Sequence, residues 1–204
     1  MQHSLVFKVL DVLSDGKFHS GESIAKTFDI SRVSIWNAIK KAEEFGVEIY
    51  SVRGRGYKLI QPITLLKKSS IQNVMGEIHH WFNMEIFDVM ESTNSYLMER
   101  ASLDHPHASV AVTHIQTKGR GRRGRSWQSA LGESLTFSLL WRFNGGAATL
   151  SGLSLAVGIA LIRSLHRFGV MGAQLKWPND VLIQDGSQYK KLAGILIELQ
   201  GDME

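Results

Sequence analysis

The sequence contains no cysteine and no long hydrophobic run. The missing cysteines exclude a disulfide framework, thiolate metal sites and a cysteine nucleophile. No stretch reaches the ~18 consecutive apolar residues that a membrane-spanning helix needs. The N-terminal sequence MQHSLVFKVLDVLSDGK has too short an apolar run, and acidic residues too early, for a secretory signal. We therefore expect a soluble, cytoplasmic protein.

The composition is that of an ordinary globular protein. The 204 residues suit one large domain or two small ones, and the apolar share of 44% and the charged share of 21% exclude wholesale disorder. The formal net charge of +4 is mildly basic, which permits nucleic-acid or phosphate partners without demanding them.

Three helices are predicted in the first 45 residues. Apolar residues recur at helical spacing from Leu5 to Leu13, and Ser20 and Ser31 can cap the next two helices. The apolar face predicted for the third helix consists of Ile35, Ile39 and Ala42, with Val33 and Phe45 at its ends.

A small β-hairpin is predicted after these helices. Residues 48–51 and 57–60 are candidate strands, and Gly54 and Gly56 between them supply the positive φ that a tight turn needs. Gln61-Pro62 then interrupts the pattern. We place a domain boundary there, with a first domain at 1–62 and a second at 63–204.

This order of helices and hairpin is typical of a winged helix-turn-helix, in which the third helix enters the major groove of DNA. The alternative is a small helical domain with a merely solvated polar face, because the segment through Ile60 carries only 9 basic against 7 acidic residues. The candidate DNA-binding residues are Arg32, Ser34, Asn37, Lys40 and Lys41 on the third helix, and Arg53 and Arg55 on the hairpin.

From Ile63 onward the pattern is α/β, with helices packed on a sheet. The predicted helices lie within 63–75, 96–100 and 150–168, and the predicted strands at 85–89, 109–115, 134–142, 174–176, 181–184 and 192–199.

The most unusual segment is the basic loop, residues 118–125, which contains five basic residues, three glycines and no acid. Glycines allow close approach of the backbone to a ligand, and arginines donate bidentate hydrogen bonds to phosphate or carboxylate oxygens. The loop suits a phosphate ligand or a nucleic acid about equally, and a solvated flexible loop or a localisation tag are further readings. Because its charges repel one another, we expect it to be mobile until an anion binds.

Three further groups of residues are candidates for a ligand site. Ser92-Thr93-Asn94 offers two hydroxyls and an amide, although helix capping is the usual role of such a triplet. Lys176-Trp177-Pro178-Asn179-Asp180 places an ammonium and an acid around a turn that could bind Mg²⁺ or simply connect two strands. Lys191 opens an apolar strand and can reach a carboxylate or extend harmlessly into solvent, and Gly194 suggests a close backbone approach. We predict no metal site built on the histidines.

The four motifs and their order, behind a winged helix, closely resemble bacterial biotin–protein ligase of the bifunctional type, the biotin operon repressor. The resemblance implies a mixed-sheet catalytic domain similar to class II aminoacyl-tRNA synthetases. It implies that biotin and ATP form biotinyl-5′-AMP, and that biotin is transferred to a lysine of a biotin carboxyl carrier protein. It further implies Mg²⁺ as cofactor and a homodimer that binds operator DNA when the adenylate is bound.

The resemblance also implies roles for single residues. Lys191, Arg120 and Lys176 would be catalytic, Lys191 holding the reacting carboxylate and phosphate oxygens, and Asp180 would be the Mg²⁺ ligand. The residues implied in biotin binding are Ser92, Thr93, Asn94, Gln116, Gly119, Arg120, Gly121, Arg122, Lys191 and Gly194. Those implied in ATP or adenylate binding are Arg120, Arg122, Arg123, Arg125, Trp127, Lys176 and Asn179.

Family members of this type continue beyond the position of Glu204 with further strands and a small β-barrel, so we expect the catalytic domain to be incomplete here. The alternative function is a DNA-binding biotin sensor that lacks full ligase activity.

Overall fold

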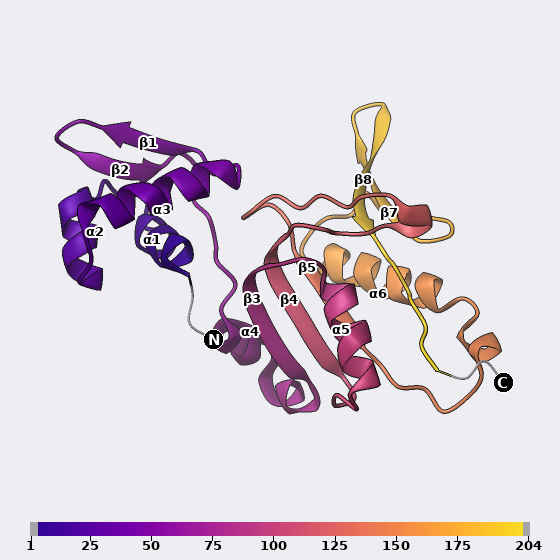
Figure 1. Ribbon diagram of the computed structural model, residues 1–204. Helices are drawn as coiled ribbons and strands as arrows, with labels where there is room; N and C mark the ends of the chain where they lie inside the picture. The colour runs from indigo at the N-terminus through magenta and orange to yellow at the C-terminus, as the bar shows by residue number, and fades with distance from the viewer. Residues whose placement is uncertain (1–3, 202–204) are drawn as a thin grey trace. The chain divides into compact units, whose positions relative to one another are not determined.

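The computed structural model describes residues 4–201, without the side chains of Ala147 and Thr149 (Figure 1). The ends of both predicted domains, residues 1–3 and 202–204, lie outside this range. Contacts divide the chain into two compact units, the first formed by Met1–Gly119 and Trp127–Arg142, the second by Arg120–Ser126 and Phe143–Glu204. None of the described helices is both long enough and apolar enough to cross a membrane.

The first part of the first unit is a winged helix. Its core contains side chains from all three helices and from the hairpin, among them Phe7, Ile24, Ile35 and Leu59, each at most 2% exposed. Its elements are α1 (Leu5–Leu13), α2 (Gly21–Phe28), α3 (Arg32–Glu44), β1 (Ile49–Val52) and β2 (Gly56–Leu59).

Capping and turn residues place these elements as the sequence predicts. The Ser20 hydroxyl accepts a hydrogen bond from the Ser23 N–H at 3.0 Å, and the Ser31 hydroxyl accepts one from the Ser34 N–H at 3.1 Å. Each bond satisfies a backbone donor that the first turn of a helix leaves free. Gly56 has a φ of +99°, and a Cβ there would collide with the carbonyl of His19, so only glycine suits this close contact.

The rest of the first unit is a three-stranded mixed sheet in the order β3-β4-β5. β3 and β4 run parallel and are joined through α5, and β5 pairs antiparallel with β4. β4 is the buried centre, since seven of its eight residues are buried. The elements are α4 (Lys68–Met75), the 3₁₀ helix η1 (Gly76–Trp81), β3 (Asn83–Met90), α5 (Thr93–Ser102), β4 (Ser109–Gln116) and β5 (Thr136–Leu140).

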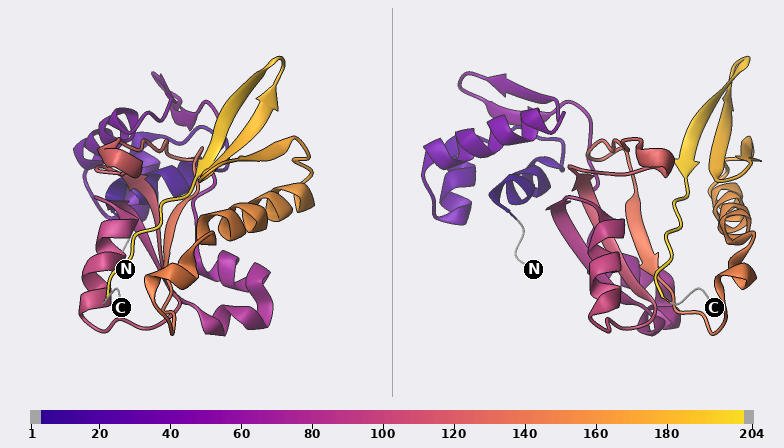
Figure 2. Two further views of the ribbon diagram at one scale, coloured as in Figure 1. Left: turned by 90° about the vertical axis from the view of Figure 1, so that its right-hand side faces the viewer. Right: turned by 45° about the vertical axis from the view of Figure 1, so that its right-hand side comes forward.

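The second unit is an antiparallel sheet, β6-β7-β8, beside a long helix. Gly158 of α6 packs against Leu175 of β6 so closely that a Cβ would collide with the Leu175 side chain. The hairpin formed by β7 and β8 projects away from α6 (Figure 2). The elements are η2 (Arg122–Gly124), η3 (Ala147–Leu150), α6 (Leu153–Arg167), β6 (Ala173–Lys176), β7 (Asp180–Asp185) and β8 (Gln188–Gly194).

The structure corrects several predicted boundaries. The bounds of the strand predicted at 192–199 are wrong, since β8 covers Gln188–Gly194. The strand begins earlier because Gly186, with a φ of +60°, allows a tight turn directly after β7. Lys191 therefore lies inside the strand rather than at its start. The helix predicted at 150–168 is divided at Gly152, whose φ of +86° separates η3 from α6.

One predicted core position is also wrong. Val33 is 66% exposed, whereas Ile35, Ile39 and Ala42 of the same helix are buried as predicted. Val33 lies near the N-terminus of α3 on the face opposite the core, so its apolar character has no packing role within the described residues.

Candidate functional site

A partly buried polar network lies at one edge of the β3-β4-β5 sheet. Because β3 and β4 are parallel, their carboxyl ends meet at the same edge, which is where open α/β sheets usually bind ligands. Ser92 and Thr93 follow β3 and are only 4% and 3% exposed, and Gln116 is the last residue of β4. The sequence motif and the end of β4 are thus brought together by strand direction alone.

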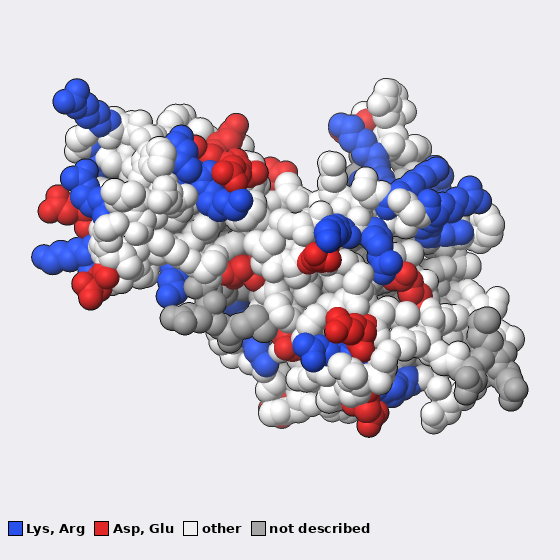
Figure 3. Space-filling model, viewed as in Figure 1, with Lys and Arg blue, Asp and Glu red and all other residues white. Residues whose placement is uncertain are grey.

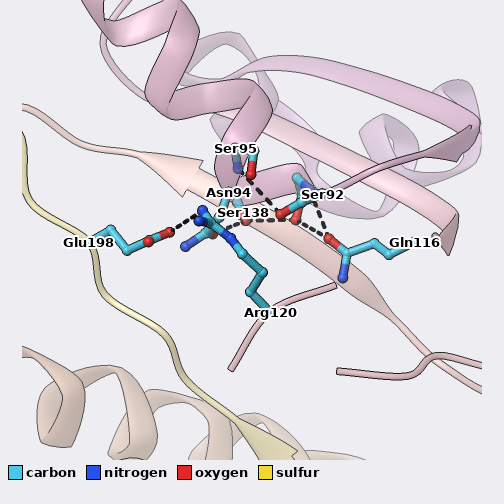
Figure 4. A network of polar contacts seen from close by, with 8 residues as sticks. Ser92, Asn94, Ser95, Gln116, Arg120, Ser138 and Glu198 are labelled. Carbon is cyan, nitrogen blue, oxygen red and sulfur yellow. Dashed lines mark hydrogen bonds and ion pairs between the residues drawn. The ribbon is translucent and has the colours of Figure 1, made fainter. Parts of the chain in front are cut away.

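The network is centred on Thr93. Its backbone N–H and its hydroxyl both donate to Oε1 of Gln116, at 2.8 and 3.1 Å, and its hydroxyl is 2.8 Å from the Ser138 hydroxyl. The Ser138 hydroxyl in turn donates to Oδ1 of Asn94 (Figure 4). These bonds hold amide and hydroxyl groups in a fixed arrangement. Such a set of donors and acceptors can bind a small polar ligand with carbonyl and N–H groups.

Ser92 caps α5, the role that competes with ligand binding in the sequence. Its hydroxyl accepts from the Ser95 N–H at 3.3 Å, so its lone pair is partly used by the helix. Ser138, by contrast, is a functional candidate that sequence analysis misses. The sequence signal for Ser138 is its place two residues after Thr136 in an apolar strand, which puts both polar side chains on the same inward face.

α5 is fastened to β3 through a tyrosine. The Tyr96 hydroxyl donates to Oε1 of Glu85 at 2.9 Å, and its ring packs edge-on against Phe87 with 5.0 Å between the ring centroids. Burial, and then the hydrogen bond to the Glu85 carboxylate, raise the pKa of Tyr96 above its ordinary value. This contact fixes the helix whose first turn carries Thr93 and Asn94.

The basic loop leaves the sheet next to this network. The Trp127 N–H donates to the Gly119 carbonyl at 2.8 Å and joins the two ends of the loop. A Cβ on Gly119 would collide with the Trp127 carbonyl and lie 2.9 Å from Nε2 of Gln116. Glycine is therefore required at position 119 by steric contact. At Gly121 it is not, since the nearest atom would be 3.5 Å away.

Within the second unit, the rest of the loop is folded on itself. The Gly121 N–H donates to the Arg125 carbonyl at 2.7 Å, and Arg120 forms an isolated β-bridge with Ser126. Arg122 donates to the side-chain oxygen of Asn179 at 3.0 Å, and Arg120 pairs with the Glu198 carboxylate at 3.0 Å (Figure 4). The basic loop is thus held by oxygen acceptors of the chain itself, as expected of groups that bind anions.

Glu198 and Glu91 are partners that sequence analysis misses. Glu91, in the first unit, pairs with Lys118 at 2.7 Å. Both acids are far from their partners in sequence and carry no motif, so only the fold brings each pair together.

Lys191 and Asp180 form an ion pair, with Nζ 2.7 Å from Oδ1. They lie on the neighbouring strands β8 and β7, and Gly194 is the register partner of Asp180. Asn179 forms two hydrogen bonds with Ile195. Its side-chain amide donates to the Ile195 backbone carbonyl at 2.8 Å, and its backbone carbonyl accepts from the Ile195 N–H at 2.9 Å. The segment 176–180 therefore both connects two strands and positions polar groups, so the two readings of its sequence are compatible.

A cavity of about 260 Å³ opens beside this segment. It combines apolar side chains from α6 and from the segment after β8 with three polar side chains. Its lining includes Arg122, Leu153, Pro178, Asn179, Ile195 and Ile197. An apolar cavity with an arginine and an amide at its wall suits a flat or apolar group that is attached to an anion.

Among residues 4–201, no group of three or more His, Cys, Asp or Glu side chains could hold a metal ion. Asp180 supplies a single carboxylate, which already pairs with Lys191. Mg²⁺ that is bound through nucleotide phosphates needs only one or two protein carboxylates, so these residues fit a nucleotide-borne ion and not a protein-only site.

The candidate DNA-binding residues lie on α3 and on the β1–β2 hairpin. Ser34 is occupied in part by its 2.9 Å contact with the Ser31 hydroxyl, and Arg55 stacks on the Phe18 ring at 4.4 Å. Lys40 and Lys41 pair with Glu43 and Glu44 at 2.7 and 2.6 Å. Figure 3 shows the mixed charges at the end of α3 and the Lys and Arg side chains at the hairpin. The remaining exposed candidates are Arg32, Asn37 and Arg53.

Comparisons with known proteins match two separate regions of the chain. The Biotin/lipoate A/B protein ligase family matches residues 86–203, and an HTH domain matches residues 6–58. The chain is 37% identical over 199 residues to the bifunctional ligase/repressor BirA of Escherichia coli, a match that covers 98% of the chain and 59% of that protein. It is 32% identical to BirA of Bacillus subtilis, covering 91% of the chain and 56% of the relative. The chain thus spans less than three fifths of the length of these relatives.

A solved structure of the biotin protein ligase from Aquifex aeolicus, in complex with biotin and ATP, is 35% identical. The match covers 59% of this chain and 48% of that one, with a TM-score of 0.49.

Proposed function

The chain belongs to the biotin/lipoate A/B protein ligase family, and from this premise we propose that it is an ATP-dependent biotin–protein ligase that also represses transcription. The observation that carries the proposal is the partly buried network of Thr93, Asn94, Gln116 and Ser138, which holds neutral donors and acceptors at the ends of the strands. The ureido group of biotin, with one carbonyl and two N–H groups, needs this kind of partner. All four residues of the network lie within the range that matches the family.

The first reaction joins two anions. A carboxylate oxygen of biotin attacks the α-phosphorus of ATP, the bond from that phosphorus to the bridging oxygen breaks, and pyrophosphate leaves. Cationic groups must neutralise and align the reactants. We assign this role to Arg120 and Lys191, each of which binds a carboxylate of the chain itself, and to Lys176, whose side chain is exposed near Asp180.

The other assignments follow the sequence motifs. Ser92, Gly119, Gly121, Arg122 and Gly194 complete the proposed biotin site. The proposed nucleotide site consists of Arg120, Arg122, Arg123, Arg125, Trp127, Lys176 and Asn179. Asp180 would hold a Mg²⁺ ion that enters with ATP, and the ion would supply charge neutralisation at the phosphates.

In the second reaction, the amine of a lysine on a biotin carboxyl carrier protein attacks the biotin carbonyl carbon, the bond to AMP breaks, and the amine loses a proton. We further propose that the adenylate favours a homodimer that binds operator DNA through the winged helix. One ligand would thereby control two outputs.

The test is direct. The 204-residue chain is incubated with biotin, Mg²⁺ and ATP labelled at the α-phosphate, and the products are separated. We expect biotinyl-5′-AMP and an equal amount of pyrophosphate. Absence of both, in a protein that binds no biotin by calorimetry, would contradict the proposal. Biotin binding without adenylate would instead support the alternative, a biotin sensor that regulates transcription.

A further inference from the structure

The outward face of α3 carries two large apolar side chains. Ile35, Ala38, Ile39 and Ala42 face the winged-helix core and are at most 4% exposed. On the other side, Val33 is 66% and Trp36 is 51% exposed. Together with Asn37 and Lys40, these two residues follow the spacing i, i+3, i+4 and i+7 that brings side chains to one face of a helix.

The charges on α3 single out its first two turns. At the C-terminal end, Lys40 and Lys41 are paired with Glu43 and Glu44, so that end is nearly neutral. At the N-terminal end, Arg32 has no acidic partner among residues 4–201, and the helix dipole adds positive potential. The apolar pair therefore lies within the electropositive end of the helix, which in a helix-turn-helix is the end that reaches the bases.

An apolar pair in this position points to one base. In the major groove, only thymine presents an apolar group, its C5-methyl, and an asparagine can form two hydrogen bonds to adenine. We propose that Val33 and Trp36 contact thymine methyl groups in the operator and that Asn37 binds a neighbouring adenine. The proposal rests on the DNA-binding part of the proposed function and names the base pairs that it would recognise.

A DNA duplex fits this surface better than a protein partner does. Two apolar side chains make a small patch, and the basic residues Arg32 on α3 and Arg53 on the hairpin match a phosphate backbone. Protein interfaces of comparable stability need a much larger apolar centre.

The experiment uses the 204-residue chain with biotin and ATP to select duplexes from a random pool at low salt. Each thymine of the selected sites is then replaced by deoxyuridine, which lacks only the C5-methyl group. We expect selected half-sites rich in A·T pairs. We expect a roughly four-fold loss of affinity at each contacted thymine, which corresponds to about 0.8 kcal/mol per methyl group.

Two variants connect the effect to the residues. For each of Val33→Ala and Trp36→Ala, we expect one position of the site at which replacing thymine by deoxyuridine no longer changes the affinity. Val74→Ala and Trp81→Ala remove side chains outside the winged helix that are even more exposed, at 90% and 76%, and should keep the full discrimination. Both pairs of variants should unfold at the temperature of the wild type.

The possible failures are distinct. Sequence-selective binding that does not distinguish thymine from deoxyuridine would overturn this inference and leave the repressor function standing. Failure to select any duplex would overturn both. A change of oligomeric state in Trp36→Ala without DNA would identify the surface as a protein interface and would also overturn the inference.

Discussion

At the residue scale, Gly119 shows how a single steric contact shapes the candidate site. Alanine at this position would place its Cβ against the Trp127 carbonyl and near Gln116, so the joined ends of the basic loop must open. We expect Gly119→Ala to lower the free energy of unfolding by about 1–3 kcal/mol, the range for overpacking. Gly172→Ala is the control, because nothing lies within 4 Å of its Cβ. Urea unfolding measures both, and equal values for the two variants would contradict the steric argument.

Tyr96 leads to a second prediction at the residue scale, a dependence of the free energy of unfolding on pH. The pKa of its phenol is raised by burial and by the hydrogen bond to Glu85. A raised pKa in the folded state gives stability that is complete below the unfolded value of about 10 and is lost as the pH rises through the folded value. Between pH 9 and 11, roughly the range of tyrosine titration, the free energy of unfolding of the wild type should fall more steeply than that of Tyr96→Phe. Parallel curves from urea unfolding would show that Tyr96 is not coupled to folding.

At the scale of elements, the β1–β2 hairpin depends on Gly56, the first residue of β2. The His19 N–H donates to the Tyr57 carbonyl at 2.9 Å, and the Tyr57 N–H donates to the His19 carbonyl at 2.8 Å, so β2 is tied to the segment before α2. We expect Gly56→Ala to cost about 2 kcal/mol or more, because it adds a collision with His19 to an unfavourable φ. Gly54 also has a positive φ, but no atom lies near the position of an added Cβ, so Gly54→Ala should cost only about 1 kcal/mol. Thermal unfolding that ranks the two variants in reverse order would contradict this role.

The elements also show what the sequence can predict. Ser20 and Ser31 mark helix starts correctly because capping is local, and the positive φ of Gly54 and Gly56 follows from turn chemistry. The start of β8 cannot be read from apolar content, because pairing with β7 decides it. Periodicity alone places Val33 with the core, because it cannot separate a core position from an apolar contact surface.

At the scale of the whole molecule, the sequence names most of the candidate site but not the partners that hold it. The pairs Arg120–Glu198 and Lys118–Glu91 join residues far apart in the chain, and no local pattern announces either acid. The motifs carry the groups proposed to meet the substrate, whereas their partners follow only from the fold. A substitution of one of the acidic partners therefore tests how the motif residue is positioned. A substitution of the motif residue itself tests its proposed role toward the substrate.

A substitution of the motif residue Lys191 can separate the two proposed outputs, adenylate formation and DNA binding. It lies on β8 beside Lys190, and each lysine pairs with an acid of β7, Asp180 and Asp185 respectively. Because the side chains of Lys190 and Lys191 are 65% and 43% exposed, removing either should leave the fold intact. Lys191→Ala should lower adenylate formation by about 10²- to 10³-fold, the usual cost of losing a group that stabilises developing charge, and Lys190→Ala should change it little. With biotinyl-5′-AMP supplied in excess, DNA binding measured by fluorescence anisotropy should be the same for both variants. If Lys191→Ala lost adenylate formation and DNA binding equally, Lys191 would be a structural residue of β8, and the coupling between the two outputs would have to run through other groups.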